Sequence, residues 1–327
     1  MSQTETPMFT VAIPVHNRQD LIRHALESAF AQRFTDFEVL VVDDGSTDQT
    51  SSVLAEYGDR IRALRQDNAG IGAARNTCIA NAHGRYLAWL DSDDLWFPWT
   101  LATFAKVIEA HDEPALILGA PRPFANVDDL KAAQETALDV CRYTDPFATA
   151  PDKISRGTSA AVARTDILRD SPGFEPQHMN YEDVDFFMKI GTAPGTIKIH
   201  QPYTVAYRQH VGSTSTAHPD KTLKGIDQLI VSEKAGRYPG GPGRRWERRQ
   251  IICREVRGSI DLAVRHGRWL AAVELYARCL HWQLRLGRFR FLLGMPVYAL
   301  LRTLLPGRAR RVRRSVKNAT AMAGPEL

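Results

Sequence analysis

The first 120 residues alternate between short apolar runs and segments with helical spacing, and this order constrains the fold more than any other feature. Phe9–Val15 is a short β-rich run, and the apolar residues of segment 21–30 recur with helical spacing. Phe37–Asp44 is a continuous apolar run ending in two carboxylates, which is typical of a strand buried on both faces. Such alternation predicts an α/β fold with a Rossmann-like, mostly parallel central sheet flanked by helices.

Four polar clusters lie at the ends or turns of these predicted elements. In open sheets of this kind, ligands bind beyond the carboxyl ends of the strands, so we expect the clusters to share one edge. There is neither a GxGxxG after the first strand nor a GxxxxGK, so the usual dinucleotide and P-loop motifs are absent. The four clusters are residues 16–18, 43–48, 68–76 and 91–94.

The sequence DSDD at residues 91–94 follows an apolar strand. Side chains in a strand alternate with period two, so Asp91 and Asp93 are expected on the same side. Two converging carboxylates repel each other unless a cation shares them, and a hard divalent ion would also neutralise phosphates. The alternative is that these aspartates end the strand and cap the next helix, a role we expect for Asp94.

The segment NAGIGAARN, residues 68–76, has small residues where the backbone must approach a ligand or a neighbouring strand. Arg75 falls in the first turns of the helix that follows. A tight turn with a solvated arginine would have the same pattern. The functional interpretation therefore depends on all four clusters occurring in order along one edge.

Together these blocks resemble the family 2 glycosyltransferases, which are inverting enzymes of the GT-A fold. The resemblance covers roughly residues 8–216 and thins between residues 121 and 155, where acceptors usually bind in the family. Segment 157–159 is expected to line the acceptor pocket just before a return to the sheet. The matching blocks are IPVHNR, FEVLVVDDGSTD, NAGIGAARN, YLAWLDSDDLWFP, PGF, YEDVDFF and YRQHVGSTS.

The resemblance implies a site for a nucleoside diphosphate sugar, with UDP as the first expectation. Asp44 would read the base, Asp93 would bind Mg²⁺ or Mn²⁺, and His210 would help to hold the metal or the diphosphate. The remaining donor-site residues implied are Pro14, His16, Arg18, Asn68, Arg75 and Asp91.

The family's ED motif implies a base for the acceptor hydroxyl. Here the motif is Glu182 and Asp183, with Asp183 the better match. A divalent ion would stabilise the diphosphate leaving group, so a base is the remaining requirement. The alternative is the start of an amphipathic helix whose dipole favours acids. Asp185 is expected on the helix surface or in a cap, and Trp96 is expected in the core unless it stacks on a sugar ring.

Charge divides the chain into two parts. Residues 237–317 contain 20 Lys and Arg against 4 Asp and Glu, a net charge of +16, whereas residues 1–236 contain 22 against 32, a net charge of −10. We therefore expect a glycosyltransferase domain over residues 1–218 and a basic helical region over residues 219–327 with a different partner.

The basic region combines arginines with apolar residues between residues 281 and 314, as interfacial helices do. Its longest apolar run, residues 291–301, is too short for a membrane span of roughly 20 residues. We therefore expect a cytoplasmic protein, attached peripherally to the inner face of the membrane. Core-packed helices with a solvated basic tail, or nucleic-acid binding, are the alternatives.

The sequence thus predicts a metal-dependent transferase that extends a surface or envelope glycan or glycolipid. A GDP- or dTDP-sugar donor is one alternative, and an inactive sugar-nucleotide-binding scaffold at a membrane is another. The four cysteines are far apart and form no CxxC pair, and no apolar leader precedes Met8, so neither secretion, a disulfide framework nor a zinc cluster is expected.

Overall fold

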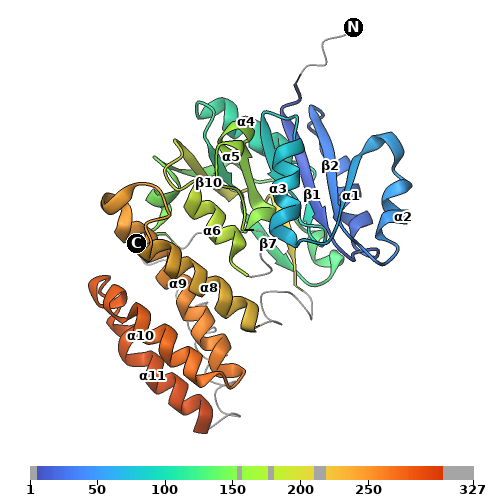
Figure 1. Cartoon of the computed structure of the whole chain (residues 1–327). Coiled ribbons are helices and arrows are strands. Elements are labelled where there is room, and N and C mark those ends of the chain that lie inside the picture. Colours follow the sequence, from blue (N-terminus) through green and yellow to red (C-terminus); the bar gives the residue numbers. More distant parts are fainter. Residues whose placement is uncertain (1–5, 153–156, 176–179, 210–218, 305–327) are drawn as a thin grey trace. The chain divides into compact units, whose positions relative to one another are not determined.

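The computed structural model describes residues 6–152, 157–175, 180–209 and 219–304 (Figure 1). By packing, the chain divides into two compact units, residues 1–248 and 249–327. Helix α8 (Pro219–Lys234) therefore packs with the first unit. The boundary that we expect after residue 218 concerns the extent of the catalytic domain and stays a prediction.

An eight-stranded sheet forms the centre of the first unit. Four of the seven pairings in its described part are parallel, and the parallel strands β1 to β4 are neighbours, as the alternating sequence predicts. In spatial order the strands are β3 (Arg62–Gln66), β2 (Phe37–Asp44), β1 (Phe9–Val15), β4 (Tyr86–Trp89), β9 (Ala161–Arg164), β6 (Leu116–Leu118), β10 (Thr196–Gln201) and β8 (Asp139–Tyr143).

Helices cover both faces of this sheet (Figure 1). The alternating side chains of β1 explain the two layers, because Val11 and Ile13 belong to one hydrophobic core and Ala12 to the other. The first core is shared with α1 (Ile22–Phe30), α2 (Thr50–Ala55) and α4 (Thr100–Ala110). The second is shared with α3 (Ile71–Asn81), α5 (Thr165–Arg169) and α6 (Glu182–Lys189).

A small second sheet lies beside the DSDD segment. It contains β5 (Leu95–Trp96), β11 (Val205–Arg208) and β7 (Pro121–Phe124), with β11 in the centre. The antiparallel pairing of β5 with β11 brings the residues just before β5 close to Arg208. Short 3₁₀ segments complete the unit: η1 (Gly58–Arg60), η2 (Val127–Leu130), η3 (Pro146–Thr149), η4 (Thr158–Ala160) and η5 (Gly241–Arg244).

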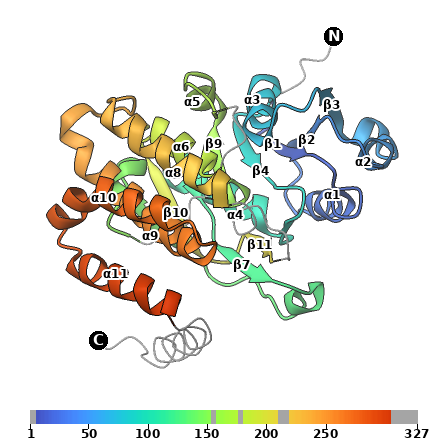
Figure 2. The same cartoon turned by 60° about the horizontal axis from the view of Figure 1, so that its bottom comes forward.

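The described part of the second unit consists of helices α9 (Arg245–Arg265), α10 (Trp269–Arg285) and α11 (Phe289–Leu304), and α9 begins in the first unit (Figure 2). Buried residues on all three helices form the interior, including Val256, Cys279, Trp282 and Leu292. Among the described helices, none is both long enough and apolar enough to cross a bilayer.

Candidate active site

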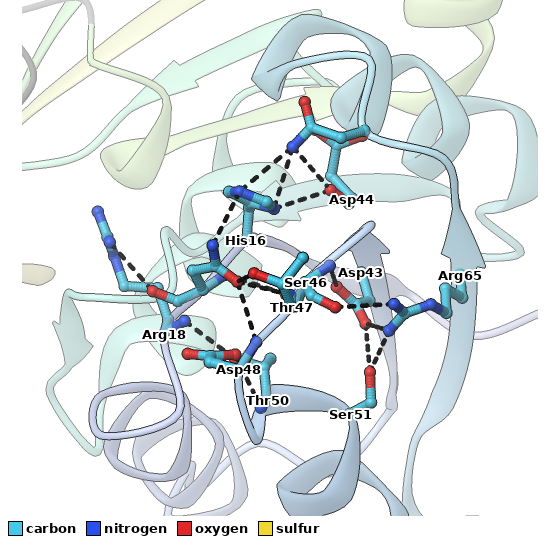
Figure 3. A network of polar contacts seen from close by, with 12 residues as sticks. His16, Arg18, Asp43, Asp44, Ser46, Thr47, Asp48, Thr50, Ser51 and Arg65 are labelled. Carbon is cyan, nitrogen blue, oxygen red and sulfur yellow. Dashed lines mark hydrogen bonds and ion pairs between the residues drawn. The ribbon is translucent and has the colours of Figure 1, made fainter.

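The carboxyl ends of β1 and β2 bring the first two polar clusters together. The parallel register places Val15 opposite Asp43, so the residues that follow β1 meet the end of β2. His16 Nδ1 lies 2.9 Å from the carbonyl oxygen of Asp44, and Asn68 Nδ2 donates to the same oxygen at 3.0 Å (Figure 3). Three of the predicted donor-site residues are therefore in contact. Pro14 is buried one position before Val15, within β1.

The Asp44 side chain holds the loop that follows β3. Its Oδ1 accepts hydrogen bonds from Gln66 Nε2 at 2.7 Å and from the backbone N–H of Ala69 at 3.0 Å. Its Oδ2 accepts from the backbone N–H of Gly70, the residue that caps α3, at 2.8 Å. The carboxylate is buried and fixes the approach to α3. Its role in reading a base stays a prediction.

Gly45 allows the turn after β2 to touch this loop. Its φ is +70°, in the left-handed region, and a Cβ there would lie 2.7 Å from the backbone nitrogen of Asn68. A side chain at this position would therefore be strained and would push away the Asn68 loop.

Asp43 anchors the same turn and was not assigned a role from the sequence. Burial raises its pKa, but hydrogen bonds from Ser46 and Ser51 and the charge of Arg65 outweigh burial, so its pKa is lowered. The Ser46 N–H donates to Asp43 Oδ1 at 2.9 Å, and Arg65 Nη1 lies 2.5 Å from Oδ2 (Figure 3). The sequence signal that could have identified Asp43 is its position at the end of the apolar run of β2.

Arg18 connects these clusters with the DSDD segment. Its backbone N–H donates to Thr50 Oγ1 at 2.9 Å, and Thr50 N–H donates to Asp48 Oδ1 at 3.0 Å, so the start of α2 is tied to the end of β1. Arg18 Nη2 lies 3.9 Å from Asp93 Oδ2, and both side chains are partly exposed. Arg18 and Asp93 therefore face each other at the open edge of the sheet.

Arg75 joins DSDD to the ED motif. Its Nη2 lies 3.0 Å from Asp91 Oδ1, and its Nη1 lies 2.8 Å from Glu182 Oε1. The side chain is 5% exposed, so the interpretation of Arg75 as a solvated arginine is wrong. Burial lowers the pKa of Arg75, but the charges of the surrounding carboxylates raise it by more than burial lowers it. The pKa is therefore raised, and the guanidinium stays charged. Contact of Arg75 with a nucleotide stays a prediction.

Asp94 does not cap the next helix. The N-cap of α4 is Trp99, and no side chain caps that helix. Asp94 is instead buried, and its Oδ1 accepts from the backbone N–H of Arg208 on β11 at 2.8 Å. Burial, together with the charges of Asp91 and Asp93, raises the pKa of Asp94 to about 8. The expectation of a cap is wrong because β11, distant in sequence, covers this residue.

The acids at the start of α6 have different surroundings. Asp183 is partly exposed, and its Oδ1 accepts from the backbone N–H of Val184 at 2.7 Å. Asp185 is 1% exposed, accepts from Tyr238 Oη at 2.7 Å and lies 2.8 Å from Lys189 Nζ. The expectation that Asp185 lies on the surface or in a cap is wrong. Tyr238, which follows α8 and is distant in sequence, contacts Asp185 in the interior.

The segment before β9 is hydrogen-bonded to the DSDD turn and to Trp96. Ser159 Oγ accepts from the backbone N–H of Asp91 at 3.2 Å, and Trp96 Nε1 donates to the carbonyl oxygen of Ser159 at 3.4 Å. Trp96 is buried, which confirms its expected place in the core. The predicted return of this segment to the sheet is confirmed by β9, and an acceptor role for residues 157–159 stays a prediction.

The metal site expected from the sequence is only partly covered by the structure. Asp91 and Asp93 lie in the described chain, whereas His210 lies outside the described residues. Within residues 6–152, 157–175, 180–209 and 219–304, no group of three or more His, Cys, Asp or Glu side chains is arranged to hold a metal by itself. Metal binding with fewer protein ligands is compatible with this geometry.

Sequence comparison identifies the family of the N-terminal part. The sequence model of glycosyl transferase family 2 matches residues 10–171. An uncharacterized glycosyltransferase of Rickettsia prowazekii is 41% identical over 113 residues, which is 35% of this chain and 36% of that protein. The chondroitin synthase of Escherichia coli is 42% identical over 95 residues, which is 28% of this chain and 14% of that protein. The similarity thus spans about a third or less of these relatives.

Solved structures share the fold. Staphylococcus aureus TarS 1–349 in complex with UDP has a TM-score of 0.59 at 21% identity, over 76% of this chain and 70% of that one. The mannosyltransferase PcManGT of Pyrobaculum calidifontis has a TM-score of 0.51 at 19% identity, over 93% and 89% of the two chains. Residues 10–171 of this chain therefore belong to glycosyl transferase family 2 and are part of a GT-A fold.

Proposed function

We propose that this protein is a metal-dependent inverting glycosyltransferase that moves a sugar from a UDP-sugar to an acceptor hydroxyl of a glycan or lipid-linked glycan. The observation that carries the proposal is the buried Arg75, which contacts both Asp91 of the DSDD segment and Glu182 of the ED motif. This bridge holds the two acidic motifs, 91 residues apart in sequence, at one edge of the sheet. An enzyme of this class needs its donor site and its base close together.

The donor-binding part consists of the open edge near β1, β2 and the DSDD turn. We assign the nucleobase of the donor to the surroundings of Asp44, with Pro14, His16 and Asn68 nearby. We assign the diphosphate of the donor to the side of Arg18 and Asp93. The cationic Arg18 faces this side, and its partly exposed side chain is accessible to a ligand. The structural neighbour TarS binds UDP and UDP-GlcNAc, which supports a uridine donor here.

The carboxylates fit a divalent ion. Asp91, Asp93 and Asp94 lie within four residues, and their mutual repulsion contributes to the raised pKa of Asp94. Carboxylate oxygens are preferred ligands of Mg²⁺ and Mn²⁺, which commonly use one or two protein carboxylates together with substrate phosphates. Asp93 would hold the ion, with Asp91 beside it and His210 as a further candidate. When bound, the ion would neutralise the charge that develops on the leaving diphosphate.

The acceptor hydroxyl requires a base on the opposite side of the sugar. Asp183 is the candidate, because it is partly exposed at the N-terminus of α6 and is the better match to the family's motif. Asp183 would take the proton of the hydroxyl as the oxygen attacks the anomeric carbon. Glu182 would act through Arg75 by fixing the position of the helix start.

The biological setting that we propose is glycan synthesis. Relatives with partial similarity include the chondroitin synthase of E. coli and the succinoglycan biosynthesis protein ExoW of Rhizobium meliloti, 44% identical over 96 residues. Both names denote polysaccharide formation. We extend this to a surface or envelope polysaccharide or glycolipid made at the inner face of a cytoplasmic membrane.

The proposal is tested by sugar transfer with the full chain and a panel of UDP-sugars. Asp183→Asn is expected to lower turnover by about 10²- to 10⁴-fold, the usual contribution of a general base, while donor affinity stays within about twofold. Asp166→Asn, at an exposed acid on α5, is the control and should leave both quantities unchanged. Full turnover in Asp183→Asn would contradict the assignment of the base, and no transfer by the wild type would contradict the function.

A further inference from the structure

The second unit exposes two stripes of large apolar side chains, one on α10 and one on α11. Their spacing of three, four or seven residues, which is one or two helical turns, places each stripe along one side of its helix. Leu270 is 88% exposed and Leu293 is 76% exposed, which is unusual for leucine in a folded helix. The α10 stripe contains Leu270, Val273, Leu280 and Leu284, and the α11 stripe contains Phe289, Leu293 and Val297.

The most exposed members of the stripes, Leu270 and Leu293, contribute little to packing within the unit. The inner sides of the same helices carry separate buried residues, such as Leu275 and Trp282 on α10 and Leu292 and Met295 on α11. Each helix is therefore apolar on its packed side and on an exposed side as well. Large exposed apolar surfaces of this kind mark contacts with a partner.

The charge of the unit selects among the possible partners. Residues 249–327 contain 16 Lys and Arg against 4 Asp and Glu, so a second copy of the unit would be repelled. Residues 305–327 supply six of these basic residues and few large apolar ones, so they are poorly suited to cover the stripes. A nucleic acid would match the charge and leave the apolar side chains uncovered. A surface that is both anionic and apolar matches the positive charge of the unit and its apolar stripes.

We propose that the exposed sides of α10 and α11 bind the interface of an anionic lipid bilayer. The apolar stripes would enter the acyl boundary, and the exposed arginines Arg285 and Arg290 would contact the lipid headgroups. The helices would lie in the plane of the interface, with their apolar stripes toward the acyl chains. The inference deepens the proposed function, since a lipid-linked acceptor would be presented at this surface, but lipid binding itself requires no catalysis.

The test is sedimentation of the full chain with vesicles of phosphatidylcholine alone and of equal parts phosphatidylcholine and phosphatidylglycerol. The wild type is expected to bind the anionic vesicles at least about tenfold more tightly than the neutral ones. Leu270→Gln combined with Leu293→Gln should weaken anionic binding by about tenfold or more, because both side chains are exposed and lose only the lipid contact. Val127→Gln combined with Leu138→Gln, at exposed apolar positions of the first unit, is the matched control and should bind as the wild type does.

Three outcomes would overturn the proposal. The first is failure of the wild type to bind anionic vesicles. The second is that the Leu270 and Leu293 changes leave vesicle binding unaffected while salt abolishes it, which would show contact through charge alone. The third is a wild-type dimer that the same changes convert to a monomer without any vesicle binding. Calorimetric titration with UDP, run on the same samples, separates this proposal from the function: UDP binding without vesicle binding refutes only the membrane surface, and the reverse refutes only the donor site.

Discussion

At the scale of single residues, Arg75 balances the charge of the site. The ion pairs of Arg75 with Asp91 and Glu182 compensate for the hydration that these groups lose on folding. The two carboxylates also raise the pKa of Arg75, so the guanidinium stays charged. Removing Arg75 would leave the partly buried carboxylates of Asp91 and Glu182 without their shared cation. The contribution of Arg75 should therefore be far larger than that of an arginine in a surface ion pair.

Arg75→Gln is expected to lower the free energy of unfolding by about 3–5 kcal/mol, because Asp91 and Glu182 lose their shared cation. Arg85→Gln is the control, since Arg85 and Glu113 form an ion pair 3.0 Å long in which both side chains are about half exposed. That change should cost about 1 kcal/mol or less. Urea denaturation of both variants measures the difference, and equal losses would show that burial of Arg75 has no energetic consequence.

Asp43 gives the first unit a dependence on pH. Its pKa is lowered in the folded chain, so the folded state prefers the carboxylate and gains stability from it above the ordinary aspartate pKa of about 4. This stability is lost as pH falls through the lowered pKa. Asp43→Asn should therefore be less stable than the wild type near neutral pH, with the difference shrinking at acid pH. Denaturation over a pH series checks this, with Asp20→Asn at an exposed position as control; a pH-independent difference would contradict the account.

At the scale of elements, α8 is placed by a very close backbone contact. Gly225 packs so tightly on the segment before α6 that a Cβ would lie 1.7 Å from the carbonyl oxygen of Asn180. The next residues along that segment are Tyr181, Glu182 and Asp183. The helix that follows the proposed catalytic domain in sequence therefore supports the start of α6.

Gly225→Ala should push α8 away from this segment and cost about 1–3 kcal/mol, as overpacking usually does, although alanine has the higher helix propensity. Gly243→Ala, where a Cβ would meet nothing within 4 Å, is the matched control and should be close to neutral. Thermal unfolding measures both. A stabilised Gly225→Ala would mean that α8 can shift freely at this point.

The elements that sequence could predict are those with strong periodicity. Strands β1 and β2 have the predicted bounds, because long apolar runs are local signals. The short strands β5, β7 and β11 were not predicted, since each contains four residues or fewer and exists through pairing with a distant segment. The same reason explains the errors at Asp94 and Asp185, whose burial depends on Arg208 and Tyr238.

At the scale of the whole molecule, the chain joins an acidic first part to a basic last part, and each has its own core. The charge pattern predicts a division of the chain with a boundary after residue 218, which stays a prediction, and the polar clusters are predicted to share one edge of the sheet. The sequence could not predict that Arg75 links DSDD to the ED motif, because the contact of Arg75 with Glu182 joins residues 107 positions apart. Donor chemistry and membrane contact are thus proposed for separate parts of the chain.

The most direct test of the central claim is calorimetric titration of UDP, GDP and dTDP into the full chain, first with Mn²⁺ and then with EDTA. We predict selective binding of UDP that weakens by about tenfold or more when the metal is removed, and a similar weakening in Asp93→Ala with the metal present. Absence of binding by all three nucleotides, or UDP binding indifferent both to EDTA and to Asp93→Ala, would contradict a metal-dependent donor site at this edge of the sheet.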